Sequence, residues 1–101
     1  MYALIRQYKI NPIFEADFIR DWKKLAEAYR TYSEFKEIRF HRELPNTYIS
    51  YECWRSREDF ERIMNDDNGV IRPLVDGVHR HCNRVNLLHH MDLIDLKDRV
   101  H

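Results

Sequence analysis

The chain has 101 residues, of which 44% are hydrophobic and 13% aromatic, enough for the core of one domain rather than a disordered chain. Lys and Arg number 17 together, as do Asp and Glu, so the formal net charge is zero. A chain without a net positive field is a poor candidate for binding nucleic acid or an anionic membrane. We expect a single domain over residues 1–101, with a flexible tail at 96–101.

The cysteines and the N-terminal segment favour a cytoplasmic location. Cys53 and Cys82 are too few for the disulfide framework of a small secreted protein, although the sequence does not exclude a bridge between them. The first ten residues carry Arg6 and Lys9 within an apolar stretch, which fits neither a signal peptide nor a membrane span.

The first predicted elements are a strand and an amphipathic helix. Residues 2–10 are apolar on both faces, which is typical of a central or covered strand. Asn11 and Pro12 form a helix start, because Asn caps and Pro suits the first turn. The apolar stripe of this helix consists of Phe14, Phe18, Trp22, Leu25 and Tyr29. The stripe predicts core packing. The sharper alternative is that one of its aromatics also lines a ligand cavity beneath the helix.

The middle of the chain predicts two strands joined by a short turn. The second strand covers Phe35–Leu44 and the third covers Thr47–Arg55. The Pro-Asn pair at 45–46 makes the turn between them, so these two strands are antiparallel neighbours.

The last third predicts a helix, a loop, a second short helix and a final strand. Ser56 is the expected N-cap of a helix that opens at Arg57. Residues 65–69 break the pattern as a loop. Ile71–Cys82 favours a short helix and Val85–Leu96 a strand. The order βαββαβ predicts an α+β, ferredoxin-like fold, with one antiparallel sheet and its helices on one face.

Such a fold leaves one face of the sheet without helices, and we call it the bare face. The side chains that we assign to it are Phe35, Glu37, Arg39, His41, Tyr48, Glu52 and Trp54. Aromatics mixed with opposite charges suit a paired interface, so we expect a homodimer through the sheet faces. The alternative is a solvated sheet face with scattered aromatics.

Three short motifs lie around the third strand: Pro-Asn-Thr-Tyr at 45–48, Tyr-Glu-Cys-Trp at 51–54 and Ser-Arg-Glu at 56–58. In these motifs the chain resembles the antibiotic biosynthesis monooxygenase family of dimeric α/β barrels. The resemblance implies a ferredoxin-like subunit whose sheet packs against that of a second subunit. It further implies oxidation of aromatic polyketides or quinols by dioxygen, without metal or flavin, in a pocket between helices and sheet. The strand-end tryptophan of such enzymes matches Trp54.

The chain also departs from that family. Many members carry a histidine in the helix after the tryptophan, where this chain has Ile63 and Met64. Haem-degrading members have an asparagine in the first strand, whereas the first strand here offers Arg6 and Gln7 and no asparagine occurs before Asn11. Their iron-binding histidine is matched only in rough position by His79 or His81. These departures disfavour haem breakdown.

Oxygenation without a cofactor requires a substrate anion held by hydrogen bonds in a dry site. Trp54 is the expected aromatic wall and its indole N–H a donor, although it could instead be a structural aromatic at the junction of sheet and helix. Arg6, Tyr51 and His41 are candidate donors or bases. Alternation does not decide which of them faces the pocket, because a slip of one residue exchanges the faces of a strand. The expected pocket residues are Phe18, Trp22, Phe40, Phe60 and Met64.

Metal, phosphate and RNA binding have less support in the sequence. His79, His81 and Cys82 are close in sequence but lack a recognisable zinc-ligand spacing, so we expect no metal and no cofactor. There is no glycine-rich phosphate loop and no RNA-binding strand motif.

Three hypotheses therefore remain. The favoured one is a cofactor-independent monooxygenase acting on a small aromatic or quinol-type substrate. The second is a non-catalytic dimer that binds a small ligand or serves a structural role, with its junction filled by Phe14, Phe18, Trp22 and Trp54. The third is haem handling.

Overall fold

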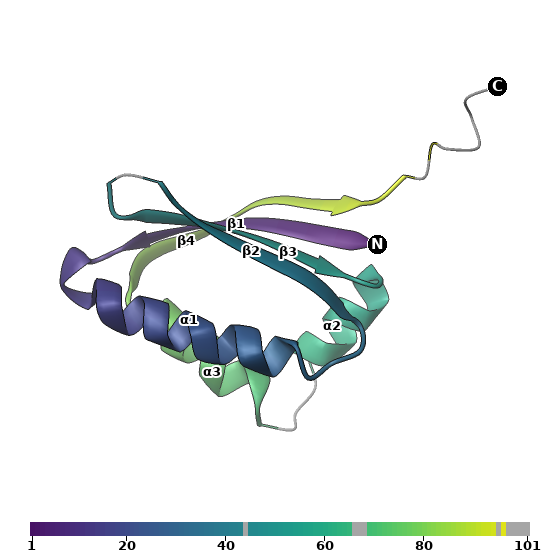
Figure 1. Cartoon of the computed structure of the whole chain (residues 1–101), viewed down its shortest axis with the longest axis horizontal. Coiled ribbons are helices and arrows are strands. Elements are labelled where there is room, and N and C mark those ends of the chain that lie inside the picture. The colour runs from purple at the N-terminus through teal and green to yellow at the C-terminus, as the bar shows by residue number, and fades with distance from the viewer. Residues whose placement is uncertain (44, 66–68, 95, 97–101) are drawn as a thin grey trace.

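An antiparallel sheet carries its helices on one face in the computed structural model, which describes residues 1–43, 45–65, 69–94 and 96 (Figure 1). The strands are β1 (Tyr2–Ile10), β2 (Phe35–Glu43), β3 (Thr47–Trp54) and β4 (Cys82–Asp92), in the spatial order β2-β3-β1-β4. The helices are α1 (Glu15–Tyr29), α2 (Arg57–Met64) and α3 (Ile71–His79), and a 3₁₀ turn, η1 (Pro12–Phe14), precedes α1. The ferredoxin-like prediction is confirmed. Except for Leu96, the expected tail lies outside the described residues.

Both predicted caps are present. The Asn11 side chain accepts a hydrogen bond of 3.1 Å from the backbone N–H of Ile13, and η1 starts there. At the start of α2, Ser56 Oγ accepts a bond of 3.1 Å from the backbone N–H of Asp59. Each cap satisfies a donor that the first helical turn leaves unpaired.

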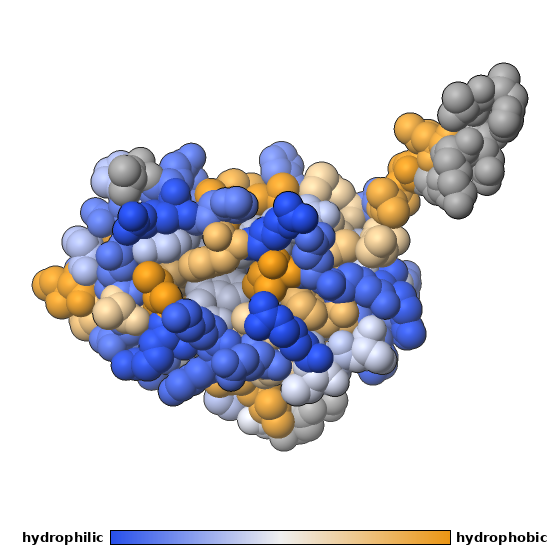
Figure 2. Space-filling view, in the orientation of Figure 1, coloured by the Kyte–Doolittle hydropathy of each residue, from blue (hydrophilic) through white to orange (hydrophobic). Residues whose placement is uncertain are grey.

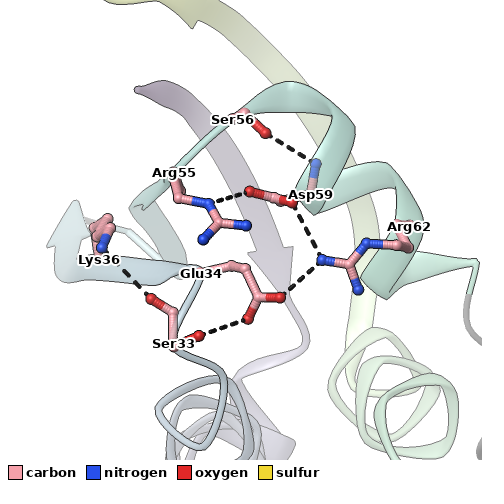
Figure 3. Close-up of polar contacts among 7 residues, drawn as sticks. All are labelled: Ser33, Glu34, Lys36, Arg55, Ser56, Asp59 and Arg62. Carbon is pink, nitrogen blue, oxygen red and sulfur yellow. Dashed lines mark hydrogen bonds and ion pairs between the residues drawn. The ribbon is translucent and has the colours of Figure 1, made fainter.

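A network of charges fastens the start of α2 to the segment before β2 (Figure 3). The Asp59 carboxylate accepts from Arg55 Nε at 2.6 Å and from Arg62 Nη2 at 3.1 Å. Arg62 Nη2 also donates to Glu34 at 2.7 Å. These hydrogen bonds hold the pKa of Asp59 well below its ordinary value, so the carboxylate is charged at neutral pH.

The core lies between α1 and the sheet. Four of the five predicted stripe residues are buried, and the fifth, Phe14, is 40% exposed because it belongs to η1 rather than α1. The ring of Phe18 is fully buried and lies 5.1–5.9 Å from those of Tyr8, Phe40 and Tyr48. Aromatic packing of this kind adds to the stabilisation from burial alone.

The predicted composition of the bare face is wrong for four residues. Tyr48, Glu52 and Trp54 are buried on the helix side of β3, and Phe35 packs against the same core. Their partners on β1 explain this, because Tyr48, Glu52 and Trp54 stand opposite Tyr8, Leu4 and Tyr2. In β2 a register shift between Phe35 and Glu37 separates Phe35 from the alternation that follows it. Glu37, Arg39 and His41 do lie on the bare face.

The end of the chain also differs from expectation. α3 stops at His79 rather than Cys82, and β4 covers Cys82–Asp92 rather than Val85–Leu96. Cys82 already pairs with Ile10 in the sheet, which excludes it from the helix. A second irregularity, where Leu88 has no partner on β1, exchanges the faces of β4, so simple alternation fails there. β2 and β3 match their predicted bounds within one residue, and Leu44 lies outside the described residues.

The bare face is more apolar than an ordinary solvated surface. Ile5, Ile49 and Tyr51 are half-buried on it, and Cys53 is buried. Arg39 Nε and Glu37 Oε1 form an ion pair of 2.7 Å beside them. Both cysteines of the chain are free. In the described part of the chain, no helix is both long and apolar enough to cross a membrane.

The core assignment predicts different costs for two phenylalanines near the start of α1. Phe18→Ala removes a fully buried ring, so we expect a loss of about 3–5 kcal/mol in the free energy of unfolding. Phe14→Ala, the matched control, should cost about 1 kcal/mol or less. Urea denaturation of both variants measures these values, and equal losses would contradict the packing described.

Candidate functional site

A buried carboxylate organises the helix side of the two central strands. Glu52 on β3 has no exposed surface. Arg6 Nη1 on β1 donates to its Oε2 at 2.8 Å, and Trp54 Nε1 donates to its Oε1 at 2.9 Å. Both oxygens are therefore satisfied, which a buried charge requires. The guanidinium carbon of Arg6 also lies 5.8 Å from the centre of the Phe60 ring, in cation–π range.

The local electrostatics follow from this burial. Burial raises the pKa of Glu52, and although Arg6 and Trp54 oppose that change, the pKa stays above its ordinary value. For Arg6, burial opposes the charged form, but Glu52 together with Tyr8 and Tyr29 outweighs burial and raises the pKa of the guanidinium. Arg6 therefore remains a cation.

A small cavity of about 60 Å³ opens against Arg6, between the sheet and the helices. It is lined by Arg6, Tyr8, Leu25, Tyr29, Met64, Val75, Val78 and His79, which come from β1 and all three helices. A cavity of about 150 Å³ accommodates one benzene ring. An aromatic ligand therefore enters only when lining side chains move.

Two phenolic hydroxyls belong to residues of this cavity. Tyr8 and Tyr29 are both nearly fully buried. Burial raises the pKa of both well above the ordinary value of 10.0, so both keep their protons and remain donors. Tyr8 Oη accepts from Ser50 Oγ at 3.4 Å, which leaves its own proton available. Among the described residues, the buried polar side-chain atom that lacks a hydrogen-bond partner is Trp22 Nε1, not the Tyr29 hydroxyl.

His79 lies at the mouth of the cavity, at the last residue of α3. Its side chain is exposed to solvent on one side and contributes to the cavity wall on the other. Its ring centre is 6.3 Å from that of Tyr8. Partial burial, and next the charge of Arg6, lower its pKa below the ordinary value of 6.5. The imidazole is therefore neutral at physiological pH.

The predicted catalytic residues separate onto the two faces of the sheet. Arg6 is in the cavity wall. Trp54 does not line the cavity but packs against Phe60 and against Tyr29, which does line it, and its indole N–H donates to Glu52. Tyr51 on β3 and His41 on β2 are on the bare face and do not line this cavity, because they pair with Ile5 and Ile49, which lie on the same face.

The predicted pocket residues are also divided. Met64 lines the cavity, Phe60 packs on Arg6, and Phe18 is in the core. Trp22 and Phe40 line a separate open groove of about 450 Å³. This groove runs between α1 and β2, on the face that is hollowed in Figure 2.

Sequence reasoning missed Glu52, Tyr8, Tyr29 and His79 as site residues. One signal was available for Glu52. It stands midway in the series Tyr48, Ser50, Glu52, Trp54, whose aromatic ends mark a buried strand face. A carboxylate in such a series requires a buried cation. The signal for Tyr29 was its place in the apolar stripe of α1, which alone predicts only packing.

Two of the side chains considered as metal ligands, those of His81 and Cys82, form polar contacts within the chain instead. His81 Nε2 lies 2.7 Å from the Asp21 carboxylate, and Cys82 Sγ donates to the Val78 carbonyl at 3.4 Å. Within the described ranges, no group of three or more His, Cys, Asp or Glu side chains is placed to hold a metal ion.

The buried pair predicts a stability change that depends on pH. Arg6→Met leaves Glu52 with only the indole donor, and we expect a loss of about 3–5 kcal/mol in the free energy of unfolding. Without Arg6 the pKa of Glu52 rises further above its ordinary value of 4.5. The folded variant then binds a proton more tightly than the unfolded chain. Its stability is greatest in acid and falls as the pH rises from 4.5 through the folded pKa.

This pH dependence is tested by measuring the free energy of unfolding at acid and neutral pH. The proteins compared are Arg6→Met and the double variant Arg6→Met/Glu52→Leu. The double variant removes both charges, so it should recover most of the loss and show no such pH dependence. A single variant that matches the native chain at every pH would contradict the buried ion pair.

Comparison with known proteins agrees with this architecture. The family model described as antibiotic biosynthesis monooxygenase matches residues 1–68. A crystal structure of an antibiotic biosynthesis monooxygenase aligns over 94% of this chain and 100% of its own, with 17% identity and a TM-score of 0.79.

Two further solved structures show the same fold. SnoaB, a cofactor-independent oxygenase from Streptomyces nogalater, aligns over 93% of each chain, with 14% identity and a TM-score of 0.76. Rv0793 from Mycobacterium tuberculosis aligns over 93% of this chain and 95% of its own, with 12% identity and a TM-score of 0.78. No curated protein sequence matches the chain. Because the family model covers more than half of its length, the chain belongs to the antibiotic biosynthesis monooxygenase family.

Proposed function

We propose that this protein is a cofactor-independent monooxygenase that oxidises a small aromatic or quinol-type substrate in the cavity beside Arg6. The observation that carries the proposal is one cavity whose wall combines the Arg6 cation with the phenols of Tyr8 and Tyr29. Fixed donors beside a cation, in a site that is partly shielded from water, are groups that can stabilise an oxyanion. Membership of the family supports the same reaction class.

The chemistry places few demands on the protein. A substrate anion is electron-rich enough to reduce dioxygen itself. At an activated methylene group, one oxygen atom becomes the new carbonyl, and the other leaves as water with the two hydrogens. The substrate supplies all the electrons. The protein stabilises the anion by fixed donors and keeps water out.

Each part of the site has a role in this scheme. Tyr8 and Tyr29 donate to the developing oxyanion, and both stay protonated because their pKa values are raised by burial. Arg6 lines the same wall as a cation whose charge Glu52 already balances. Glu52 and Trp54 do not meet the substrate; they fix the position of Arg6 through the two hydrogen bonds to the carboxylate.

We further propose that two subunits pair through the bare faces of their sheets. Ile5, Ile49 and Tyr51 form an apolar centre, and the oppositely charged Glu37 and Arg39 lie at its side. A two-fold axis sets such charges of one subunit against those of the other. The pairing would also remove the half-buried apolar side chains from water.

A second function is favoured by the size of the cavity. At about 60 Å³ it is smaller than an aromatic ring requires, which suits a dimer that binds a small ligand or none. The junction is nevertheless not filled in the way that this alternative requires, because Phe14 stays partly exposed and a partly polar cavity remains.

The monooxygenase proposal predicts an asymmetry between two tyrosines. Tyr29→Phe removes only the buried hydroxyl, so the rate of oxygen consumption with an anthrone or a hydroquinone should fall by about 10²–10³, the usual effect of one lost oxyanion donor. Tyr51→Phe makes the same chemical change on the bare face and should keep the native rate. An oxygen electrode measures both.

A native protein that consumes no oxygen with either substrate class would overturn the monooxygenase proposal. Equal rates for native protein and Tyr29→Phe would remove Tyr29 from the site. A loss confined to Tyr51→Phe would restore the assignment made from the sequence alone.

The dimer proposal predicts that a charge on the bare face separates the subunits. Ile49→Arg places a cation in the apolar centre, and we expect sedimentation equilibrium to give the mass of one subunit, against twice that mass for the native protein. Ile13→Arg, at an 82% exposed position near the helices, should remain dimeric. A native protein that sediments as a single subunit would refute the pairing.

A further inference from the structure

Four groups able to carry a proton or a charge meet at the cavity, and His79 is the one that is exposed. Arg6, Tyr8 and Tyr29 are at least largely buried, whereas His79 belongs to the same wall and is exposed on its outer side. A proton that leaves a substrate in this cavity must have an acceptor there and then a route to water. The Arg6 side chain is also 20% exposed, but it remains a cation and cannot accept a proton, so the route that we consider runs through His79 at the end of α3.

We infer that His79 is the base that takes the hydroxyl proton from a phenolic or enolic substrate bound beside Arg6, and that it passes this proton to solvent at the cavity mouth. The inference rests on the proposed function, which leaves the base unassigned. In this step the substrate O–H bond breaks, an N–H bond forms on the imidazole, and the electron pair remains on the substrate oxygen. No oxidant is needed until dioxygen reacts with the anion.

Charge balance in the cavity supports His79 over the alternatives. Arg6 is already neutralised by Glu52 at 2.8 Å, so a second buried anion would be unpaired. When the proton moves to His79, an imidazolium forms at the mouth and balances the new anion, while water solvates its outer side. Glu52 cannot act as this base, because both of its oxygens accept hydrogen bonds and neither is exposed.

The protonation state of His79 before the reaction is also that of a base. A base must be unprotonated at the working pH, and burial together with the charge of Arg6 lowers the pKa of His79 below 6.5. The charged or titratable groups that face it are Arg6 and Tyr8 on β1, Tyr29 on α1, Glu52 on β3 behind Arg6, and Arg72 and Asp76 on α3 itself. Of these, Asp76 acts in the opposite direction without cancelling the effect.

The first experiment compares the pH dependence of kcat/KM for oxygen consumption in native protein and in His79→Gln. The native profile should rise with pH through a step below pH 6.5, as the imidazole loses its proton. His79→Gln should lose that step and fall by about 10²–10⁴ in rate, the usual contribution of a general base. His89→Gln, an exposed histidine on the bare face, should keep the native profile. An unchanged profile in His79→Gln would overturn the inference while the monooxygenase activity stands.

A second readout is independent of turnover. 4-Nitrophenol is not oxidised by this route, and its phenolate has an absorbance distinct from that of the phenol. Native protein should bind it as phenolate at a pH below its ionisation in water, and His79→Gln should bind the neutral phenol. If native protein consumes no oxygen but ionises 4-nitrophenol through His79, the monooxygenase proposal fails and the base assignment stands. Equal ionisation in both proteins, or none in the native protein, would overturn the assignment.

Discussion

The structure depends on one constraint, which is that the charge of Glu52 must be balanced inside the sheet. A carboxylate with no exposed surface is tolerated only when its oxygens receive hydrogen bonds and a cation lies beside it. Arg6 supplies the cation from the neighbouring strand, and Trp54 supplies the second donor from two residues along the same strand. The positions of the arginine and the tryptophan are therefore not independent. Each is held because the carboxylate between them would otherwise be unsatisfied.

This constraint explains why the site lies where it does. The aromatic core fills the space under α1, from Phe18 to Tyr29, and seals that side of the cavity from water. Arg6 cannot be enclosed by apolar rings, since it must keep its carboxylate partner and a polar environment. The cavity is the space that this requirement leaves between β1 and α3. Its phenolic and imidazole groups share a low-dielectric setting in which hydrogen bonds to a developing charge are stronger than in water.

The two faces of the sheet have separate tasks. The helix side holds the buried charges and the cavity, and the bare face carries the half-buried apolar residues. The bulges in β2 and β4 maintain this separation, because each one shifts the alternation at a sheet edge without disturbing the central pair of strands. A residue such as Tyr51 is therefore only one position away from the buried Glu52 in sequence, yet it belongs to a different surface.

The sequence by itself determined the elements, the fold class and the family resemblance, because these depend on local chemistry and spacing. Asn11, Ser56 and the α1 stripe act through contacts within a few residues, and the Trp54 motif needed no knowledge of its surroundings. The bounds of β2 and β3 followed from the turn at 45–46. Among the residues that line the cavity, Arg6 and Met64 were predicted as site residues from the sequence.

Tertiary structure alone decided which side chains share a face and which share a cavity. Glu52 and Trp54 were assigned to the bare face because alternation has two equivalent phases, and only pairing with Leu4 and Tyr2 of β1 selects one. Tyr29 and His79 end two helices that are separated by some fifty residues, and no local pattern connects them. Their meeting with Arg6 depends on how α1 and α3 pack across the sheet. Packing is a property of the whole chain, since it is set by the joint burial of residues distant in sequence.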